Sequence, residues 1–430
     1  MSDQTAAGIS TRKTLGTEGT DFRFTPNERQ LLRRLAEKVA ELAARPGENE
    51  KRKLWYRINA LEPGRPVIFC DPENGWKEII TSAQLKCTNK LARHWEMTLR
   101  KEIFWGEQMR DDRVIEPDFN VAYHYQETDW GMCDTKIGGH NGGSYTWEAP
   151  LKDYQRDFAK LKFPQIQVDY ELTHRIIQHA ETLFGDLLNV RLKGVWWWTL
   201  GMTWTLITLR GLSNFMFDFY EHPNELHRLL AFLRDGHVAK LDFLEANGLL
   251  SLNNNGTYVG SGGFGYTHEL PQKDFSGKVR LQDLWGFGES QETVSVSPHL
   301  FEEFIFPYQL AILSRFGLNC YGCCEPVDGR WLVLKKIPNL RRVSVSPWAN
   351  VEKMAEFLGD QFIYSRKPAP TDIAVANPDW EKIRADLRNF IRVTRNCRVE
   401  IIMKDNHTIA HNPLNVIKWC QIAREEAERA

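Results

Sequence analysis

The sequence predicts an α/β protein folded as a (β/α)8 TIM barrel with extra helices at its N-terminus. From residue 67 onward, about eight short, apolar and β-branched segments are mostly separated by helical patterns. Such segments are typical of parallel strands buried on both faces. Eight strand–helix units favour a closed barrel over an open sheet. No linker or close internal repeat divides residues 25–430, so we expect one barrel domain there.

The N-terminal third contributes the extra helices and an insertion. Residues 1–24 are polar and predict a disordered tail. A helix is expected after Thr25, with Thr25 as N-cap, Pro26 in the first position and Glu28 closing a capping box. Further helices are expected over 50–60 and 82–104, with a strand at 66–70 between them. Residues 106–165 form an insertion, for which we expect a strand at 119–125 and a glycine-rich loop at 138–147.

From residue 168 the alternation becomes regular. Strands are expected at 190–195, 249–252, 293–296, 318–321, 342–345, 362–365 and 399–403. Helices are expected at 170–184, 200–220, 223–247, 298–315, 331–336, 351–358, 380–395 and 413–428. In such barrels the active-site groups lie on the loops that follow the strands. The candidates selected by position alone include Asp71, Glu73, Asn253, Glu325, Ser346, Lys367, Lys404, Asp405 and His407.

Composition excludes several classes of partner. The 430 residues carry a formal net charge of −1, which gives no bulk attraction to nucleic acid or to an anionic membrane. The most apolar run, residues 195–209, is shorter than the ~20 residues that span a bilayer. No apolar secretory segment is visible, and eight scattered cysteines do not resemble a disulfide framework. We therefore expect a cytoplasmic protein with reduced thiols and no membrane or nucleic-acid partner.

A cysteine cluster at residues 316–326 is the main chemical signal. Cys320, Cys323 and Cys324 form a C-x2-C-C pattern, and Glu325 adds a carboxylate. Donors this close repel one another unless they are protonated or neutralised by a cation, and zinc accepts sulfur, nitrogen and oxygen ligands. The alternative is a buried strand end in which the cysteines act as small hydrophobic residues. No second C-x-x-C or H-x-C pair completes a metal site.

Several other residues are candidates with an ordinary structural alternative. His407 is a candidate metal ligand or a loop histidine bonded to backbone. Glu325 and Asp405 are candidate catalytic acids, or members of an ion pair and a helix cap. Asn253, Trp198 and Tyr321 are candidate substrate contacts, although the first interpretation of Asn253 is a turn and that of Trp198 is core packing.

Several segments, taken in order and spacing, resemble the uroporphyrinogen decarboxylase superfamily. They are residues 55–57 with 66–67, residues 209–211 with 218–223, residues 297–308 and residues 344–348. The resemblance covers residues 51–425 and implies a (β/α)8 barrel with N-terminal helices. The tetrapyrrole decarboxylases carry an arginine-rich segment after the first strand, whereas residues 70–75 here are acidic. That difference argues against a polycarboxylate tetrapyrrole substrate.

A second branch, the zinc-dependent methylcobamide methyltransferases, places an H-x-C pair after a late strand and another Cys in the last loop. Here the pair falls on Tyr321 and Cys323, and the last loop offers His407. The chain looks most like members with a Tyr-Gly-Cys-Cys-Glu-Pro motif. The resemblance implies zinc held by Cys323, by Cys324 or Glu325, and by His407, with one position open, and a corrinoid (cobalamin) on a partner protein.

We therefore expect a methyltransferase or demethylase that moves a methyl group between a small substrate and a corrinoid or thiol acceptor. One alternative is a metal-independent decarboxylase, that is, a lyase, acting on a smaller substrate. The other is a corrinoid- or ligand-binding protein without catalysis. A cobalt-binding D-x-H-x-x-G loop is absent from the sequence.

Overall fold

The computed structural model describes residues 20–139 and 145–430. The strands there are β1 (Val67–Cys70), β2 (Asp118–Ala122), β3 (Tyr125–Glu127), β4 (Thr135–Gly138), β5 (Tyr145–Glu148), β6 (Ile166–Val168), β7 (Asn189–Lys193), β8 (Trp285–Gly288), β9 (Leu318–Tyr321), β10 (Leu340–Val345), β11 (Ile363–Arg366) and β12 (Arg398–Met403). The helices are α1 (Pro26–Ala43), α2 (Pro46–Asn59), α3 (Trp76–Ile79), α4 (Lys90–Phe104), α5 (Tyr154–Asp157), α6 (Tyr170–Phe184), α7 (Thr203–Arg210), α8 (Leu212–Glu221), α9 (Pro223–Ala246), α10 (Pro298–Leu300), α11 (Phe306–Leu313), α12 (Trp331–Leu334), α13 (Val351–Leu358), α14 (Trp380–Val393) and α15 (Leu414–Glu428).

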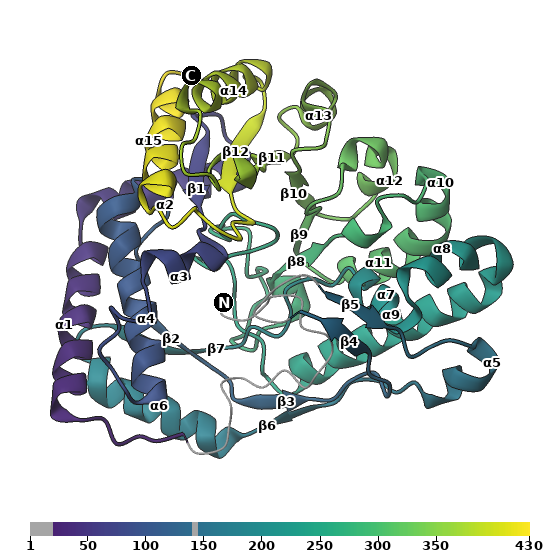
Figure 1. Cartoon of the computed structure of the whole chain (residues 1–430), viewed down its shortest axis with the longest axis horizontal. Helices are drawn as coiled ribbons and strands as arrows, with labels where there is room; N and C mark the ends of the chain where they lie inside the picture. The colour runs from purple at the N-terminus through teal and green to yellow at the C-terminus, as the bar shows by residue number, and fades with distance from the viewer. Residues whose placement is uncertain (1–19, 140–144) are drawn as a thin grey trace.

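The central feature is a six-stranded sheet in the order β1-β12-β11-β10-β9-β8. Every neighbouring pair is parallel. The first and last strands of the chain are neighbours, with Val67 opposite Glu400 and Cys70 opposite Met403. Figure 1 shows this as purple β1 beside yellow β12, with α14 and α15 next to them. All six carboxyl ends therefore lie along one edge of the sheet.

The two faces of the sheet differ because side chains alternate along each strand. One face packs under the helices and carries apolar residues such as Val343, Tyr364 and Ile401. The opposite, inner face carries Trp285 and Phe287 from β8 and a smaller set of apolar side chains. It also carries a buried ion pair, in which Arg342 Nε lies 3.0 Å from a carboxylate oxygen of Glu400. The inner face is thus partly polar.

The predicted strands at 66–70, 190–195, 318–321, 342–345, 362–365 and 399–403 are confirmed, with shifts of one or two residues at their ends. The strand predicted at 293–296 is wrong, because Gln291–Thr293 forms a 3-10 turn in which the Thr293 hydroxyl bonds back to Ser290. The strand that pairs with β9 at this edge of the sheet is β8, which precedes the predicted segment. The strand predicted at 249–252 is also wrong, because these residues form neither a strand nor a helix. Six strands of an α/β fold are thus in one sheet, and a closed eight-stranded barrel stays a prediction.

The N-terminal helices pack as a separate layer around α1, α4 and α6, at the left of Figure 1. The capping box is confirmed, since Thr25 caps the Glu28 N–H and the Glu28 carboxylate accepts from Thr25 N. The third expected helix is shorter than predicted and begins at Lys90, after the N-cap Asn89. Phe24, the last residue of the predicted tail, is buried against Trp95 and His179. The rest of the predicted tail, 1–19, lies outside the described residues.

The insertion supplies short strands that pair outside the main sheet. β2 pairs with β7 in parallel, and β3 pairs with β6 in the antiparallel sense. The glycine-rich loop predicted at 138–147 overlaps an antiparallel hairpin of β4 and β5, whose residues 140–144 lie outside the described part of the chain. None of the helices in residues 20–139 and 145–430 combines the length and apolar character needed to cross a bilayer.

Candidate active site at the carboxyl ends of the parallel strands

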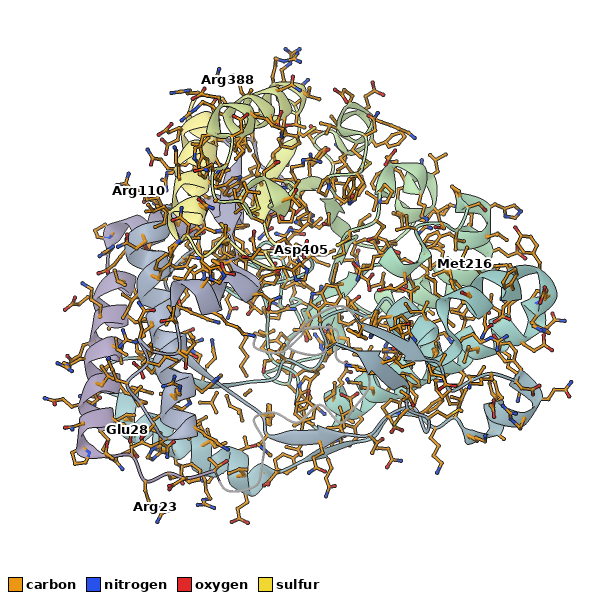
Figure 2. The ribbon with its side chains drawn as sticks, in the orientation of Figure 1. Arg23, Glu28, Arg110, Met216, Arg388 and Asp405 are labelled. Carbon is orange, nitrogen blue, oxygen red and sulfur yellow. The ribbon has the colours of Figure 1, made fainter. Side chains whose placement is uncertain are left out.

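The loops that follow β1, β8, β9, β11 and β12 lie at one edge of the sheet because these strands are parallel. They place a set of titratable groups there: Glu73 after β1, Glu289 after β8, Cys323 after β9, Lys367 after β11, and Lys404 with Asp405 after β12. We call these residues the strand-end cluster. Asp405, labelled near the middle of Figure 2, marks the β12 end of it.

Cys323 lies on the inner side of the sheet and is 3% exposed. Its Sγ contacts the Ser261 hydroxyl at 3.5 Å and the Sγ of Cys324 at 3.7 Å. The preceding Gly322 has φ +97°, and a Cβ there would meet the carbonyl oxygen of Ser344 at 2.8 Å. This position favours glycine because most L residues avoid that conformation. The tight turn directs Cys323 inward, while Cys324 is exposed.

The protonation state of Cys323 follows from these contacts. The contact with the Cys324 thiol, followed by burial, raises the pKa of Cys323 well above its ordinary value. The positive charge of Lys404 acts in the opposite direction. The thiol is therefore protonated at neutral pH, and a protonated thiol is a weak nucleophile.

Glu325, a predicted acid, is 1% exposed and faces the backbone. Its two oxygens accept hydrogen bonds from the N–H groups of Cys323 at 2.9 Å and Ser290 at 2.8 Å. Burial raises the pKa of Glu325, and these backbone bonds act against the rise. In this structure Glu325 joins the turn after β9 to the turn after β8, and its role as an acid stays a prediction.

Two buried lysines stand at the ends of β11 and β12. Lys367 Nζ donates to the Ser365 hydroxyl at 2.6 Å, and that hydroxyl donates to Glu400 at 2.5 Å. Burial lowers the pKa of Lys367 to about 7, and the charge of Lys404 adds to this effect. Lys404 Nζ lies 3.4 Å from Asp405 and 3.7 Å from Glu73. The predicted acid Asp405 is thus the ion-pair partner of a buried lysine.

Two carboxyl groups of the cluster are shifted toward the neutral form. Burial raises the pKa of Glu73 to about 7, although Lys404 opposes the rise. Burial also raises the pKa of Glu289 well above its ordinary value, and the nearby Glu292 and Glu325 raise it further. One Glu289 oxygen accepts from the Gln291 N–H at 3.0 Å, and the other has no hydrogen-bond partner among the described residues. Burial and the neighbouring carboxylates therefore favour the protonated form of Glu289.

A glycine-rich segment, residues 257–265, crosses the inner face and contacts each part of the site in turn. A Cβ on Gly260 would meet Cys320 at 2.8 Å, and one on Gly262 would meet Ile402 at 2.7 Å and Lys367 Nζ at 3.2 Å. Between these glycines, Ser261 contacts Cys323. Glycines are needed here because the segment lies directly on the sheet.

An aromatic pocket lies beside this segment. We define it by its lining residues: Lys193, Gly194, Val195, Trp196, Trp197, Trp198, Leu250, Ser251, Asn253, Thr257, Tyr258, Val259, Gly260, Leu284, Trp285 and Phe287. Three of these, Val259, Trp285 and Phe287, pack in the same apolar cluster as Cys323, and Trp198 packs against that cluster. Cys323 does not line the pocket itself, but it belongs to the apolar cluster that forms part of the pocket's lining.

The predicted substrate contacts fall in different places. Trp198 lines the aromatic pocket and packs edge-on against Phe287, with ring centroids 5.6 Å apart. Asn253 also lines it, but its amide is bonded to both backbone groups of Trp285. Tyr321 faces the helix layer, where its hydroxyl donates to Gln309 at 2.7 Å. Of these three residues, Trp198 therefore stays the best candidate for a substrate contact.

The three predicted metal ligands are not gathered in this arrangement. The sulfurs of Cys323 and Cys324 are close together, whereas the His407 side chain is exposed in the loop after β12. Across residues 20–139 and 145–430, no group of three or more His, Cys, Asp or Glu side chains is placed to hold an ion. The two cysteine sulfurs suit a thiophilic metal, but His407, the third predicted ligand, does not lie beside them.

Sequence reasoning misses Lys193, Tyr258, Ser261 and Glu289. Lys193 lies at the carboxyl end of a correctly predicted strand. The rule that active-site groups lie at or after strand ends, which selects Lys367, therefore also applies to Lys193. Glu289 follows β8, which the sequence does not indicate as a strand. Ser261 and Tyr258 lie in the glycine-rich segment, and nothing local in the sequence indicates that this segment crosses the sheet.

No family model matches the chain, and no curated protein matches it. Among solved structures, a methyltransferase from Methanosarcina mazei is similar, with a TM-score of 0.48 and 11% sequence identity. The similarity covers 87% of this chain and 98% of that chain.

Proposed function

We propose that this protein is a methyltransferase that moves a methyl group between a small substrate in the aromatic pocket and a thiol or corrinoid acceptor. The observation that carries the proposal is that Cys323 and three residues lining the pocket pack in one apolar cluster. A sulfur packed beside an apolar, aromatic pocket suits methyl transfer, because the reacting carbon is uncharged and water must be kept away. We keep the uroporphyrinogen decarboxylase superfamily as the proposed family and the corrinoid protein as the proposed partner.

The residues of the strand-end cluster have distinct tasks in this proposal. Methyl transfer breaks the bond between the methyl carbon and a heteroatom of the donor, and the heteroatom keeps the electron pair. Glu289, whose protonated form is favoured by burial, supplies the proton that this heteroatom takes up. Lys404 supplies a fixed positive charge, because Tyr258, Asp405, Cys323 and Glu73 together raise its pKa against the effect of burial.

Zinc, which the resemblance implies, would convert a buried cysteine thiol into a thiolate. Cys323 and Cys324 are the two residues that fit it, with sulfurs 3.7 Å apart. The exposed His407 side chain does not fit as a third ligand in the present arrangement. The tasks given above to Glu289 and Lys404 do not require the metal.

The test uses the full chain. Methyl transfer to cob(I)alamin or to a free thiol is followed by absorbance and mass spectrometry, with methanol, methylamines and aryl methyl ethers as donors. Cys323→Ala is expected to lower the rate at least 100-fold, whereas Cys397→Ala, at another buried cysteine, keeps it. Full activity in Cys323→Ala contradicts the proposal.

Metal content is measured on the same preparations by elemental analysis. About one zinc per chain is expected in the wild type and in Cys397→Ala, and much less in Cys323→Ala. His407→Ala is the informative third variant. If it retains zinc, His407 is excluded as a ligand while the two cysteines remain.

One observation favours the alternative of a metal-independent decarboxylase. Lys404 is a buried cation at the strand ends, and Lys367, with a pKa of about 7, is partly protonated beside it. Such positive charge stabilises a substrate carboxylate and the negative charge left when CO2 departs. Asp405 would then be the acid that protonates the product. This alternative predicts CO2 release that resists chelators and Cys323→Ser and is abolished by Asp405→Asn.

A further inference from the structure

The aromatic pocket contains a cation that the proposed methyl transfer does not use. Lys193 ends β7 and lines the pocket together with residues 196–198, which are three consecutive tryptophans. Its Nζ donates to the Thr257 hydroxyl at 2.6 Å. That hydroxyl donates in turn to the Asn255 side chain at 2.5 Å. Lys193 is therefore held in place by neutral groups.

No carboxylate compensates this charge at short range. Among the described residues, no Asp or Glu oxygen lies within 4.0 Å of Lys193 Nζ. The two carboxylates that act on its charge have other partners: Asp118 pairs with Arg191, and Glu116 pairs with Arg52. Burial lowers the pKa of Lys193 to about 8, and the more distant Asp118 and Glu116 only partly offset this. An ammonium group that is partly removed from water and lacks a carboxylate partner gains from a bound anion.

The walls around Lys193 determine the shape of that anion. Trp198 and Phe287 pack edge-on, Trp285 donates its indole N–H to the Gly265 carbonyl at 3.0 Å, and Trp196 donates its own to Leu249 at 2.8 Å. Because these indole groups are already bonded, the walls offer apolar ring surface instead of hydrogen bonds. Aromatic rings pack favourably on such surfaces.

We propose that the aromatic pocket binds small aromatic carboxylates, with the ring among the tryptophans and the carboxylate on Lys193. This inference rests on the proposed function only in naming its substrate class, a methylated aromatic acid. A single lysine matches a single negative charge, and the pocket residues Val259 and Phe287 pack in the same apolar cluster as Cys323. Binding is measured separately from turnover, so failure of one proposal can be told from failure of the other.

The experiment measures binding of 4-methoxybenzoate and of its neutral relative 4-methoxybenzamide to the full chain, by calorimetry and by quenching of tryptophan fluorescence. The acid is expected to bind at least tenfold more tightly than the amide. Acetate, which has the charge without the ring, is expected to bind at least a hundredfold more weakly than the acid. Equal affinity for the acid and the amide overturns the proposal.

Variants assign the charge to one residue. Lys193→Met, which keeps the length of the side chain, is expected to remove the preference for the acid and leave amide binding unchanged. Lys193→Arg is expected to restore at least half of the preference. Lys278→Met is the control, since Lys278 is exposed and its Nζ bonds the Ala246 carbonyl. If Lys367→Met removes the preference and Lys193→Met does not, the carboxylate belongs to the strand-end cluster and the assignment to Lys193 is overturned.

Methyl transfer gives an independent outcome. If 4-methoxybenzoate binds as described but no donor is turned over, the binding inference stands and the methyltransferase proposal fails. If neutral donors react at the same rate as the acid in both wild type and Lys193→Met, the inference fails and the methyltransferase proposal stands.

Discussion

The carboxylate of Glu325 accepts a hydrogen bond from the backbone N–H of Cys323, two residues before it, at 2.9 Å. Its second oxygen accepts from the N–H of Ser290 at 2.8 Å. One buried side chain therefore holds together the turns that follow β8 and β9. The position of the Cys323 sulfur depends on this bridge as much as on the strand itself.

Replacing Glu325 by Gln keeps the shape but places an amide NH2 group against one of these N–H donors. A buried donor without an acceptor costs about 1–3 kcal/mol, so Glu325→Gln is expected to lower the free energy of unfolding by about that amount. Urea titration followed by tryptophan fluorescence measures it. Glu303→Gln, at a half-exposed glutamate, is the control and is expected to change stability by less than about 0.5 kcal/mol. Equal effects of the two changes contradict the bridging role.

Binding of an aromatic carboxylate is expected to depend on pH through Lys193. Burial lowers the pKa of Lys193 to about 8, and the charged groups around it are Asp118, Arg191 and Glu116. The ammonium form binds the carboxylate and predominates below pH 8. Affinity for 4-methoxybenzoate should therefore be constant from about pH 6 to 7.5 and fall toward tenfold per pH unit above 8. Calorimetry at several pH values tests this, and the amide should show no such fall.

The buried Arg342–Glu400 pair predicts a large effect on stability. Both side chains are at most 1% exposed. Removing one member leaves an uncompensated buried charge, so Arg342→Met is expected to cost about 3–5 kcal/mol. Arg388→Met removes an exposed arginine that pairs with Glu426 on the outer surface, labelled at the edge of Figure 2. It is expected to cost less than about 1 kcal/mol.

A double change separates charge from packing at the same pair. Arg342→Met with Glu400→Gln is expected to cost less than the sum of the single changes, because no charge is then left unpaired. Strict additivity in urea titration would show that packing, and not charge, determines the cost.

Gly262 tests the contact between the glycine-rich segment and the sheet. It has φ +135°, and a Cβ would approach Ile402 Cγ2 at 2.7 Å. Gly277 has φ +100°, and a Cβ there would meet no atom within 4 Å, so Gly277→Ala carries the conformational cost alone. Gly262→Ala is expected to destabilise by about 1–3 kcal/mol more than Gly277→Ala. A similar cost for both would mean that the segment lifts from the sheet easily.

Much of the main sheet follows from local sequence, and the failures have physical causes. The runs at β9 to β12 are apolar, β-branched or both, and the sequence predicts each of them as a strand. β8 reads Trp-Gly-Phe-Gly, and glycine usually indicates a loop. Here Gly286 is needed because a Cβ would meet the Phe316 ring at 2.6 Å. That ring comes from a distant part of the chain, so no local pattern reveals the requirement.

The candidate site is only partly accessible to the same reasoning. Position after a strand identifies Cys323, Glu325 and Lys404, which do lie at one edge. It does not show that the Tyr321 hydroxyl turns outward to Gln309, or that the His407 side chain is exposed. Alternation and loop direction depend on the register of neighbouring strands, which a single sequence does not contain.

The pairing of β1 with β12 has a consequence for biosynthesis. A ribosome completes β1 more than 300 residues before it reaches β12, so the apolar segment Val67–Cys70 waits without its neighbour through most of translation. An unpaired strand edge invites association with other chains. Release of the nascent polypeptide before residue 403 should accordingly yield aggregates, and early engagement of a chaperone near this segment should suppress them.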